Sequence, residues 1–154
     1  MNVLIIEDEN TKLEAISRLV SSQRSDLKIL AARSVRTGRS AIQADPPACI
    51  LLDMSLPTFD ISASEPGGRP QGNGGIEILR YLDAEELRPI VVIVSAYSAF
   101  AKDGRNIGLQ AFSDELIGEF PELVKGVVYF DPIQAEWSRE LLSLLNKHIP
   151  EALE

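Results

Sequence analysis

Cysteine and histidine are nearly absent from this 154-residue chain, which holds one of each, Cys49 and His148. A single cysteine excludes an intramolecular disulfide and favours a cytoplasmic setting. It stands in an apolar run, which is typical of a buried, unreactive thiol. A single histidine close to the end of the chain argues against a zinc site, because such sites are built mainly from cysteine and histidine.

Long apolar runs and positive charge are also scarce. No run reaches the roughly 20 residues that span a membrane. The N-terminus has no basic stretch followed by an apolar one, so the sequence predicts neither membrane insertion nor secretion. The formal net charge of −8 leaves no general basic surface, and we therefore expect no direct binding to nucleic acid.

Five short apolar runs alternate with segments of helical spacing. The runs predict strands over residues 3–6, 27–31, 49–52, 90–94 and 126–130. The first helix is expected to start at Asn10 or at a capping box over Thr11–Glu14. Further helices are predicted over residues 35–44, 75–82, 113–120 (capped by Ser113) and 134–147. This alternation predicts an α/β fold, a doubly wound parallel sheet with helices on both faces.

Two connections are longer than the others. Residues 58–74 are rich in glycine and small polar residues and predict a flexible insertion, whose only cation is Arg69. Residues 97–124 form an enlarged connection around one predicted helix. We expect one domain over residues 1–148, with a short tail over 149–154 that is too small for a further domain.

Polar side chains follow four of the five predicted strands, at the point where each strand ends. They are Glu7, Asp8, Asp53, Ser95 and Asp131. Each residue alone could belong to an ordinary turn, but right-handed crossovers place the carboxyl ends of parallel strands on one edge of the sheet. Carboxylates gathered there repel one another unless a cation lies among them, and oxygen ligands suit Mg²⁺. The sequence therefore predicts an acidic pocket that binds Mg²⁺.

The same segments resemble the receiver domain of two-component response regulators. The matching pieces are Ile5-Ile6-Glu7-Asp8-Glu9, Leu51-Leu52-Asp53-Met54-Ser55-Leu56-Pro57, Gly75 to Leu82, Ile93-Val94-Ser95-Ala96 and Val128-Tyr129-Phe130 followed by Pro132. The resemblance covers nearly the whole chain apart from the two long connections and the tail. It implies a five-stranded, flavodoxin-like sheet with strand order 2-1-3-4-5.

The resemblance also implies roles for individual residues. Glu7 and Asp8 resemble the acidic pair that helps to hold Mg²⁺, and the main-chain carbonyl of Ser55 would be a further metal ligand. Asp53, itself a metal ligand, resembles the phosphoacceptor, which attacks a phosphohistidine on a histidine kinase or phosphotransfer protein. Ser95 resembles the hydroxyl residue that hydrogen-bonds the phosphoryl group, and Tyr129 resembles the aromatic switch residue. The signal would then pass to a downstream protein target.

Asp131 departs from the family pattern, because receiver domains have a lysine at this position. A lysine would place an ammonium against the phosphoryl group, whereas Asp131 would add a fourth carboxylate to the pocket. We therefore expect slow phosphorylation or poor switching, improved by Asp131→Lys, unless Lys102 or Arg105 supplies the missing cation. The insertion over residues 58–74 is a second departure: it would either cover the pocket, contact a partner or simply be tolerated.

Two other functions compete with phosphorylation-dependent signalling. A receiver fold could act only as a docking module, without phosphorylation. A Toprim-like metal-dependent enzyme also has acids after its first and third strands, but it needs a second acid where this chain has Ser55. We expect no enzymatic activity beyond self-phosphorylation and autodephosphorylation of Asp53.

Overall fold

A parallel five-stranded sheet forms the centre of the protein, seen in a computed structural model that describes residues 1–58, 74–102 and 104–151. Its strands are β1 (Asn2–Ile6), β2 (Lys28–Ala32), β3 (Cys49–Leu52), β4 (Ile90–Ser95) and β7 (Val124–Tyr129). They lie in the order β2-β1-β3-β4-β7, and every neighbouring pair is parallel. Since β7 is the fifth strand of this sheet along the chain, the predicted order 2-1-3-4-5 is confirmed.

The inner strands β1, β3 and β4 are apolar except for Asn2 at the start of β1 and Ser95 at the end of β4, as expected of strands with helices on both faces. All four residues of β3 are buried, from Cys49 to Leu52. Burial raises the pKa of the Cys49 thiol to about 12, so the thiol stays protonated and unreactive, as its place in the sequence predicts.

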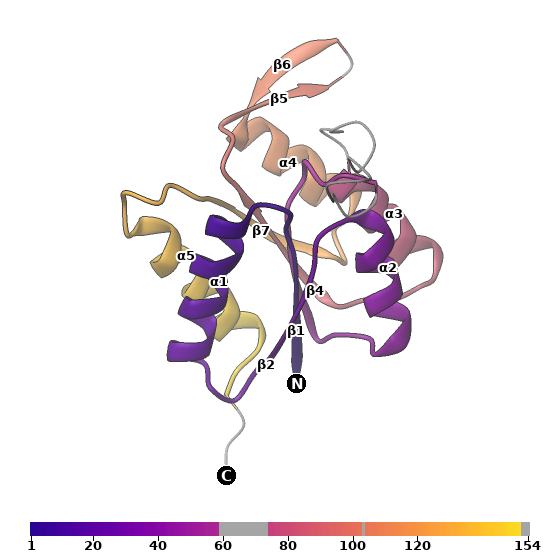
Figure 1. Cartoon of the computed structure of the whole chain (residues 1–154). Helices are drawn as coiled ribbons and strands as arrows, with labels where there is room; N and C mark the ends of the chain where they lie inside the picture. Colours follow the sequence, from indigo (N-terminus) through magenta and orange to yellow (C-terminus); the bar gives the residue numbers. More distant parts are fainter. Residues whose placement is uncertain (59–73, 103, 152–154) are drawn as a thin grey trace, which may run out of the picture.

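In the described part of the chain, five helices flank the sheet, two on one face and three on the other (Figure 1). On one face α1 (Asn10–Gln23) and α5 (Glu136–His148) bury residues such as Leu13 and Leu141 in a shared apolar cluster. On the other face lie α2 (Val35–Ala44), α3 (Gly74–Ala84) and α4 (Leu109–Glu119), packed in a second cluster. Ile149, just beyond α5, is buried in the first cluster.

The start of α1 differs from the sequence prediction. Its N-cap is Glu9, whose side chain makes no capping hydrogen bond, and Thr11 already lies inside the helix, so the predicted capping box is wrong. The alternative cap, Asn10, is inside the helix as well, and its side-chain oxygen accepts a hydrogen bond from Arg33 instead. A tertiary contact has therefore taken the oxygen that would otherwise cap the helix.

The enlarged connection between β4 and β7 contains more structure than the sequence predicts. It begins with an antiparallel hairpin of β5 (Ala99–Lys102) and β6 (Arg105–Gly108), which projects past the carboxyl edge of the main sheet (Figure 1). The next helix, α4, starts at Leu109 with Gly108 as its N-cap. Ser113 lies inside this helix, so its predicted role as the cap is wrong.

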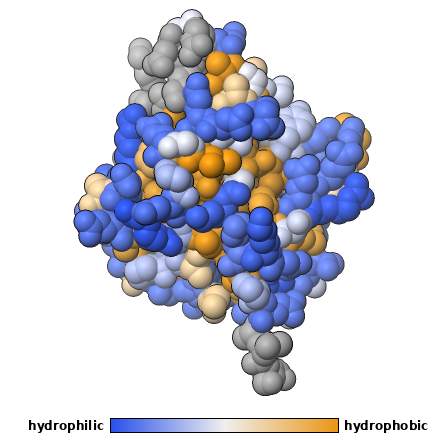
Figure 2. Space-filling model, turned by 180° about the vertical axis from the view of Figure 1, so that it is seen from behind, coloured by the Kyte–Doolittle hydropathy of each residue, from blue (hydrophilic) through white to orange (hydrophobic). Residues whose placement is uncertain are grey.

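The surface mixes polar and apolar residues. From behind, hydrophobic residues gather in the middle of the face and hydrophilic ones surround them (Figure 2). Within the described part of the chain, no helix has the length and apolar character needed to cross a membrane.

The predicted insertion over residues 58–74 falls outside the described residues except for its two ends.

Candidate functional site

The ends of β1 and β3 bring three carboxylates together. The strand pairing continues just past the sheet, because the backbone N–H of Asp53 donates to the carbonyl of Ile6 (3.0 Å) and that of Glu7 to the carbonyl of Ala32 (3.0 Å). Oxygen atoms of Glu7, Asp8 and Asp53 consequently lie within 4.8 Å of one another. This arrangement matches the convergence predicted from the strand ends, and three carboxylates are a donor set that fits Mg²⁺.

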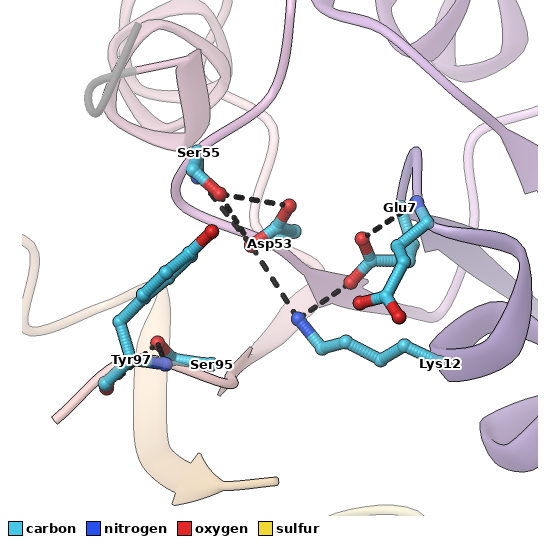
Figure 3. A network of polar contacts seen from close by, with 7 residues as sticks. Glu7, Lys12, Asp53, Ser55, Ser95 and Tyr97 are labelled. Atoms are coloured by element: carbon cyan, nitrogen blue, oxygen red, sulfur yellow. Dashed lines mark hydrogen bonds and ion pairs between the residues drawn. The ribbon is translucent and has the colours of Figure 1, made fainter. Parts of the chain in front are cut away.

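Lys12 lies among these acids, a feature that the sequence analysis missed. Its Nζ is 2.5 Å from Oε1 of Glu7 and 3.4 Å from Oδ1 of Asp53, and its side chain is only 2% exposed (Figure 3). The first turn of α1 carries it there, since Lys12 is one turn before the buried Ile16 on the same helical face. A lysine on the apolar face of a helix that follows an acidic strand end was the available signal.

The electrostatics of the cluster favour a bound proton or cation. Burial, followed by the charge of Asp53, raises the pKa of Glu7 to about 8, and the ammonium of Lys12 opposes this rise. Burial and the charge of Asp53 also raise the pKa of Asp8. One ammonium therefore leaves the three carboxylates undercompensated, which is the condition under which a divalent cation binds.

Asp53 is buried but borders an open cavity. The residue is 4% exposed, and the cavity of about 330 Å³ is lined by Glu7, Asp8, Glu9, Lys12, Asp53, Ser55, Ala96 and Tyr97. The hydroxyl of Ser55 lies 3.3 Å from each carboxylate oxygen of Asp53, and its backbone N–H lies 3.4 Å from Oδ1. The ring of Tyr97 points its hydroxyl toward Ser55 and Asp53 (Figure 3).

Two neighbouring segments support the strand ends. At the start of α3, the backbone N–H of Gly75 donates to the carbonyl of Met54 (3.0 Å), and a Cβ at Gly75 would lie 2.7 Å from the carbonyl oxygen of Asp53. Only glycine fits such an approach. On the other side, the guanidinium of Arg33 donates to the carbonyl of Asp8 (3.2 Å) and to Asn10.

Comparisons with known proteins identify this architecture, although no protein-family model matches the chain. The Detocs response regulatory protein DtcB of Enterobacter cloacae (strain JD6301) is 23% identical over 151 residues, covering 96% of this chain and 99% of that protein. A DNA-binding response regulator of the LuxR family from Staphylococcus aureus superposes with a TM-score of 0.64 and 20% identity, covering 96% and 97% of the two chains. The Mn²⁺-bound response regulator Rcp1 superposes with a TM-score of 0.65 and 15% identity, covering 99% and 98%. This chain therefore has the fold of a response-regulator receiver domain.

The predicted site residues Ser95 and Tyr129, at the ends of β4 and β7, do not join the acidic cluster. The hydroxyl of Ser95 donates to the carbonyl of Tyr97 (3.0 Å) and accepts from its N–H (3.0 Å). Tyr129, the predicted switch residue, is 43% exposed. Neither Ser95 nor Tyr129 lines the cavity beside Asp53.

Asp131 does not join the acidic cluster of the receiver domain. Its Oδ1 accepts a hydrogen bond from the backbone N–H of Ile133 (3.0 Å), and Asp131 belongs neither to the cluster nor to the cavity lining. The expectation of a fourth carboxylate in the pocket is therefore wrong, because a local turn takes the side chain. For Lys102 and Arg105, the predicted substitutes for the family lysine, the structure describes the backbone but not the side chains.

Proposed function

We propose that this receiver domain accepts a phosphoryl group on Asp53, with Mg²⁺, and signals through protein–protein contact in a phosphorelay. The single observation that carries the proposal is the position of Asp53. Its carboxylate lies with Glu7 and Asp8 within 4.8 Å and also borders a cavity open to a phosphodonor. Phosphoryl transfer needs little from a protein beyond positioning and charge neutralisation, and this constellation provides both.

In the proposed reaction, a carboxylate oxygen of Asp53 forms a bond to phosphorus as the bond from phosphorus to the leaving group breaks. The leaving group keeps the electron pair of the broken bond. Glu7, Asp8 and Asp53, together with the main-chain carbonyl of Ser55, would hold Mg²⁺, and the ion would neutralise charge on the phosphoryl oxygens. The hydroxyl of Ser55, 3.3 Å from both oxygens of Asp53, orients the carboxylate before transfer. Ser95 and Tyr129 would couple phosphorylation to a change of surface.

The proposed partners are a histidine kinase or phosphotransfer protein and a downstream protein target, in the cytoplasm. A phosphohistidine on the upstream partner would approach Asp53 through the cavity beside Tyr97. We propose no turnover beyond self-phosphorylation and autodephosphorylation, because transfer to Asp53 leaves the phosphoryl group on the protein itself. The net charge of −8 supports protein partners over nucleic acid.

Incubation with acetyl phosphate and Mg²⁺ tests this function. The wild type should gain one phosphoryl group, measured as a mass increase of the intact protein, and Asp53→Asn should gain none. Asp45→Asn is the matched control, since Asp45 is a carboxylate at the C-cap of α2, outside the cavity lining. A wild type that stays unlabelled contradicts the proposal, and a labelled Asp53→Asn variant would identify another acceptor.

Docking without phosphorylation is the second candidate function. It is favoured by Lys12, which already brings a cation to Glu7 and Asp53 and so reduces the need for a metal. Failure to bind both Mg²⁺ and a phosphoryl mimic such as beryllofluoride would support docking. A Toprim-like enzyme has weaker support, because Ser55 hydrogen-bonds Asp53 where that class of enzyme needs an acid, and a metal-dependent nuclease assay tests it directly.

A further inference from the structure

The cation at this site comes from an unexpected element. Receiver domains carry a lysine after the fifth strand of the sheet, and here that position is Asp131, whose side chain is bonded to the backbone of Ile133. Among the described residues that line the cavity beside Asp53, Lys12 is the one cation. We propose that Lys12, from the first turn of α1, supplies the ammonium that stabilises the phosphoryl group on Asp53.

The contacts of Lys12 fit this role better than that of a simple structural ion pair. A structural pair needs one partner, whereas the ammonium contacts carboxylates from two different strands, Glu7 after β1 and Asp53 after β3. Its distances to them are unequal, 2.5 Å to Glu7 and 3.4 Å to Asp53. Glu7 thus anchors the ammonium, while the longer contact leaves Lys12 able to bond a new oxygen next to Asp53.

The inference rests on the proposed function and concerns one step of it. When an oxygen of Asp53 bonds to phosphorus, the phosphoryl oxygens enter the cavity that Lys12 lines, and the leaving group departs with its electron pair. The carboxylate loses its own charge in forming the acyl phosphate, so the ammonium exchanges a contact with Asp53 for one with a phosphoryl oxygen. The positive charge is in place before transfer and needs no reorganisation.

The same charge acts in the opposite direction on the metal. An ammonium next to Glu7 and Asp53 repels a divalent cation that uses these carboxylates as ligands. Lys12 should therefore weaken the binding of Mg²⁺ while it promotes phosphorylation. Removal of a merely structural lysine would loosen the whole site and lower the Mg²⁺ affinity and the phosphorylation rate together, so the two roles differ in the sign of one measurement.

The experiment compares the full chain with Lys12→Met and with the relocated-charge variant Lys12→Met/Asp131→Lys. Phosphorylation by acetyl phosphate is followed by intact mass, and Mg²⁺ affinity is measured separately by titration calorimetry. Lys12→Met should slow phosphorylation by about 100-fold, the usual cost of one preorganised charged or hydrogen-bonding group. Its Mg²⁺ affinity should rise by about threefold or more. The double variant Lys12→Met/Asp131→Lys should be phosphorylated at least about tenfold faster than Lys12→Met.

Lys28→Met is the matched control, because Lys28 is an exposed lysine of β2, and it should change neither measurement. Lys12→Gln is the second neutral variant and should reproduce both effects if Lys12→Met does not fold. A labelled wild type with an unchanged rate in both neutral variants would overturn the inference and leave the proposed function standing. A loss of rate and of Mg²⁺ affinity together, without rescue at position 131, would overturn it as well. A wild type that takes no label contradicts the proposed function, and the inference fails with it.

Discussion

The ends of β1 and β3 and the ends of β4 and β7 lie along one edge of the same sheet, but their polar side chains behave differently. At β1 and β3, Glu7 and Asp53 reach across to each other and to Lys12. At β4 and β7, Ser95 bonds the backbone of Tyr97, and Asp131 bonds the backbone two residues further on. One half of the edge forms a shared charged site, and the other half forms two separate turns.

The difference shows that a position at a strand end is necessary for such a site but does not create it. Serine and aspartate can hydrogen-bond the backbone two residues later, and this local bond competes with any distant partner. Glu7 escapes that competition in part, because it accepts from the N–H of Glu9 through one oxygen and from Lys12 through the other. The carboxylates at β1 and β3 thus share a buried cation, Lys12, in addition to any local bonds.

Substitution of Lys12 should have the largest effect on stability, because its ammonium contacts both Glu7 and Asp53 in the charged half of the edge. We expect Lys12→Met to lower the free energy of unfolding by about 3 kcal/mol, as when one partner of a buried ion pair is removed. Urea denaturation in the presence of a chelator measures this loss. Lys28→Met should stay within about 0.5 kcal/mol of the wild type, as exposed substitutions do.

The loss should also depend on pH. The pKa of Glu7 is about 8 in the folded protein against an ordinary value of 4.5. Between these values the folded protein holds a proton that the unfolded chain has released, so the free energy of unfolding falls as pH rises through this window. Without the ammonium the window extends to higher pH, and the deficit of Lys12→Met should grow above pH 8. An equal deficit at pH 6 and pH 9 would contradict this coupling.

Gly75→Ala should come next, because it disturbs the backbone that presents Asp53. A Cβ at this position would lie 2.5 Å from the Met54 side chain and 2.7 Å from the Asp53 carbonyl oxygen, so the start of α3 must move. We expect a loss of about 2 kcal/mol, typical of overpacking at a tight contact. Gly118→Ala is the control: nothing lies near a Cβ there, and alanine in α4 should stabilise the protein by about 0.5 kcal/mol. Thermal unfolding of both variants distinguishes a steric effect from a general intolerance of alanine.

The fold was largely predictable from the sequence, because it follows from apolar runs alternating with helical segments. The meeting of Glu7, Asp8 and Asp53 was predictable too, since it follows from strand ends alone. Lys12 was not, because helical patterns assign a lysine to solvent unless its acidic partners are already placed nearby. The turn at Asp131 was missed for a related reason: sequence position does not say whether a carboxylate bonds its own backbone or a distant group. The β5–β6 hairpin was missed although the sequence holds one signal for it, the turn dipeptide Asp103-Gly104, because the apolar and polar residues on either side alternate only weakly.

Ser95→Ala and Asp131→Ala should show that the ends of β4 and β7 do not contribute to Mg²⁺ binding by the acidic cluster. Each variant loses a local turn bond, which contributes about 1 kcal/mol to the free energy of unfolding. Neither side chain belongs to the acidic cluster, so the Mg²⁺ affinity should remain within about twofold of the wild type. Asp8→Asn is the comparison, because it removes a carboxylate of the cluster and should weaken Mg²⁺ binding by about tenfold or more. A clear loss of Mg²⁺ affinity in Asp131→Ala would contradict this and show that Asp131 belongs to the same metal site as the acidic cluster.

A modest effect is expected at Arg33, which supports the charged half from outside. Its half-buried guanidinium donates to the carbonyl of Asp8 and to the side chain of Asn10, and so fixes the turn between β1 and α1. Arg33→Ala should cost about 1 kcal/mol of stability, the value of such hydrogen bonds. The Mg²⁺ affinity should fall by about threefold, because Asp8 keeps its carboxylate but loses its fixed backbone.

The double variant Arg33→Ala/Asp8→Asn identifies the route of this effect. If Arg33 acts by orienting Asp8, its loss should change the Mg²⁺ affinity little once the carboxylate of Asp8 is gone. Fully additive losses would mean that Arg33 acts on the site by a route that does not involve the carboxylate of Asp8. If Arg33 acted only through its positive charge, Arg33→Ala would raise the Mg²⁺ affinity, because the loss of a nearby cation strengthens the binding of another cation. Measured together, the two variants separate geometric support of the acidic cluster from electrostatic tuning, the role that we propose for Lys12 and not for Arg33.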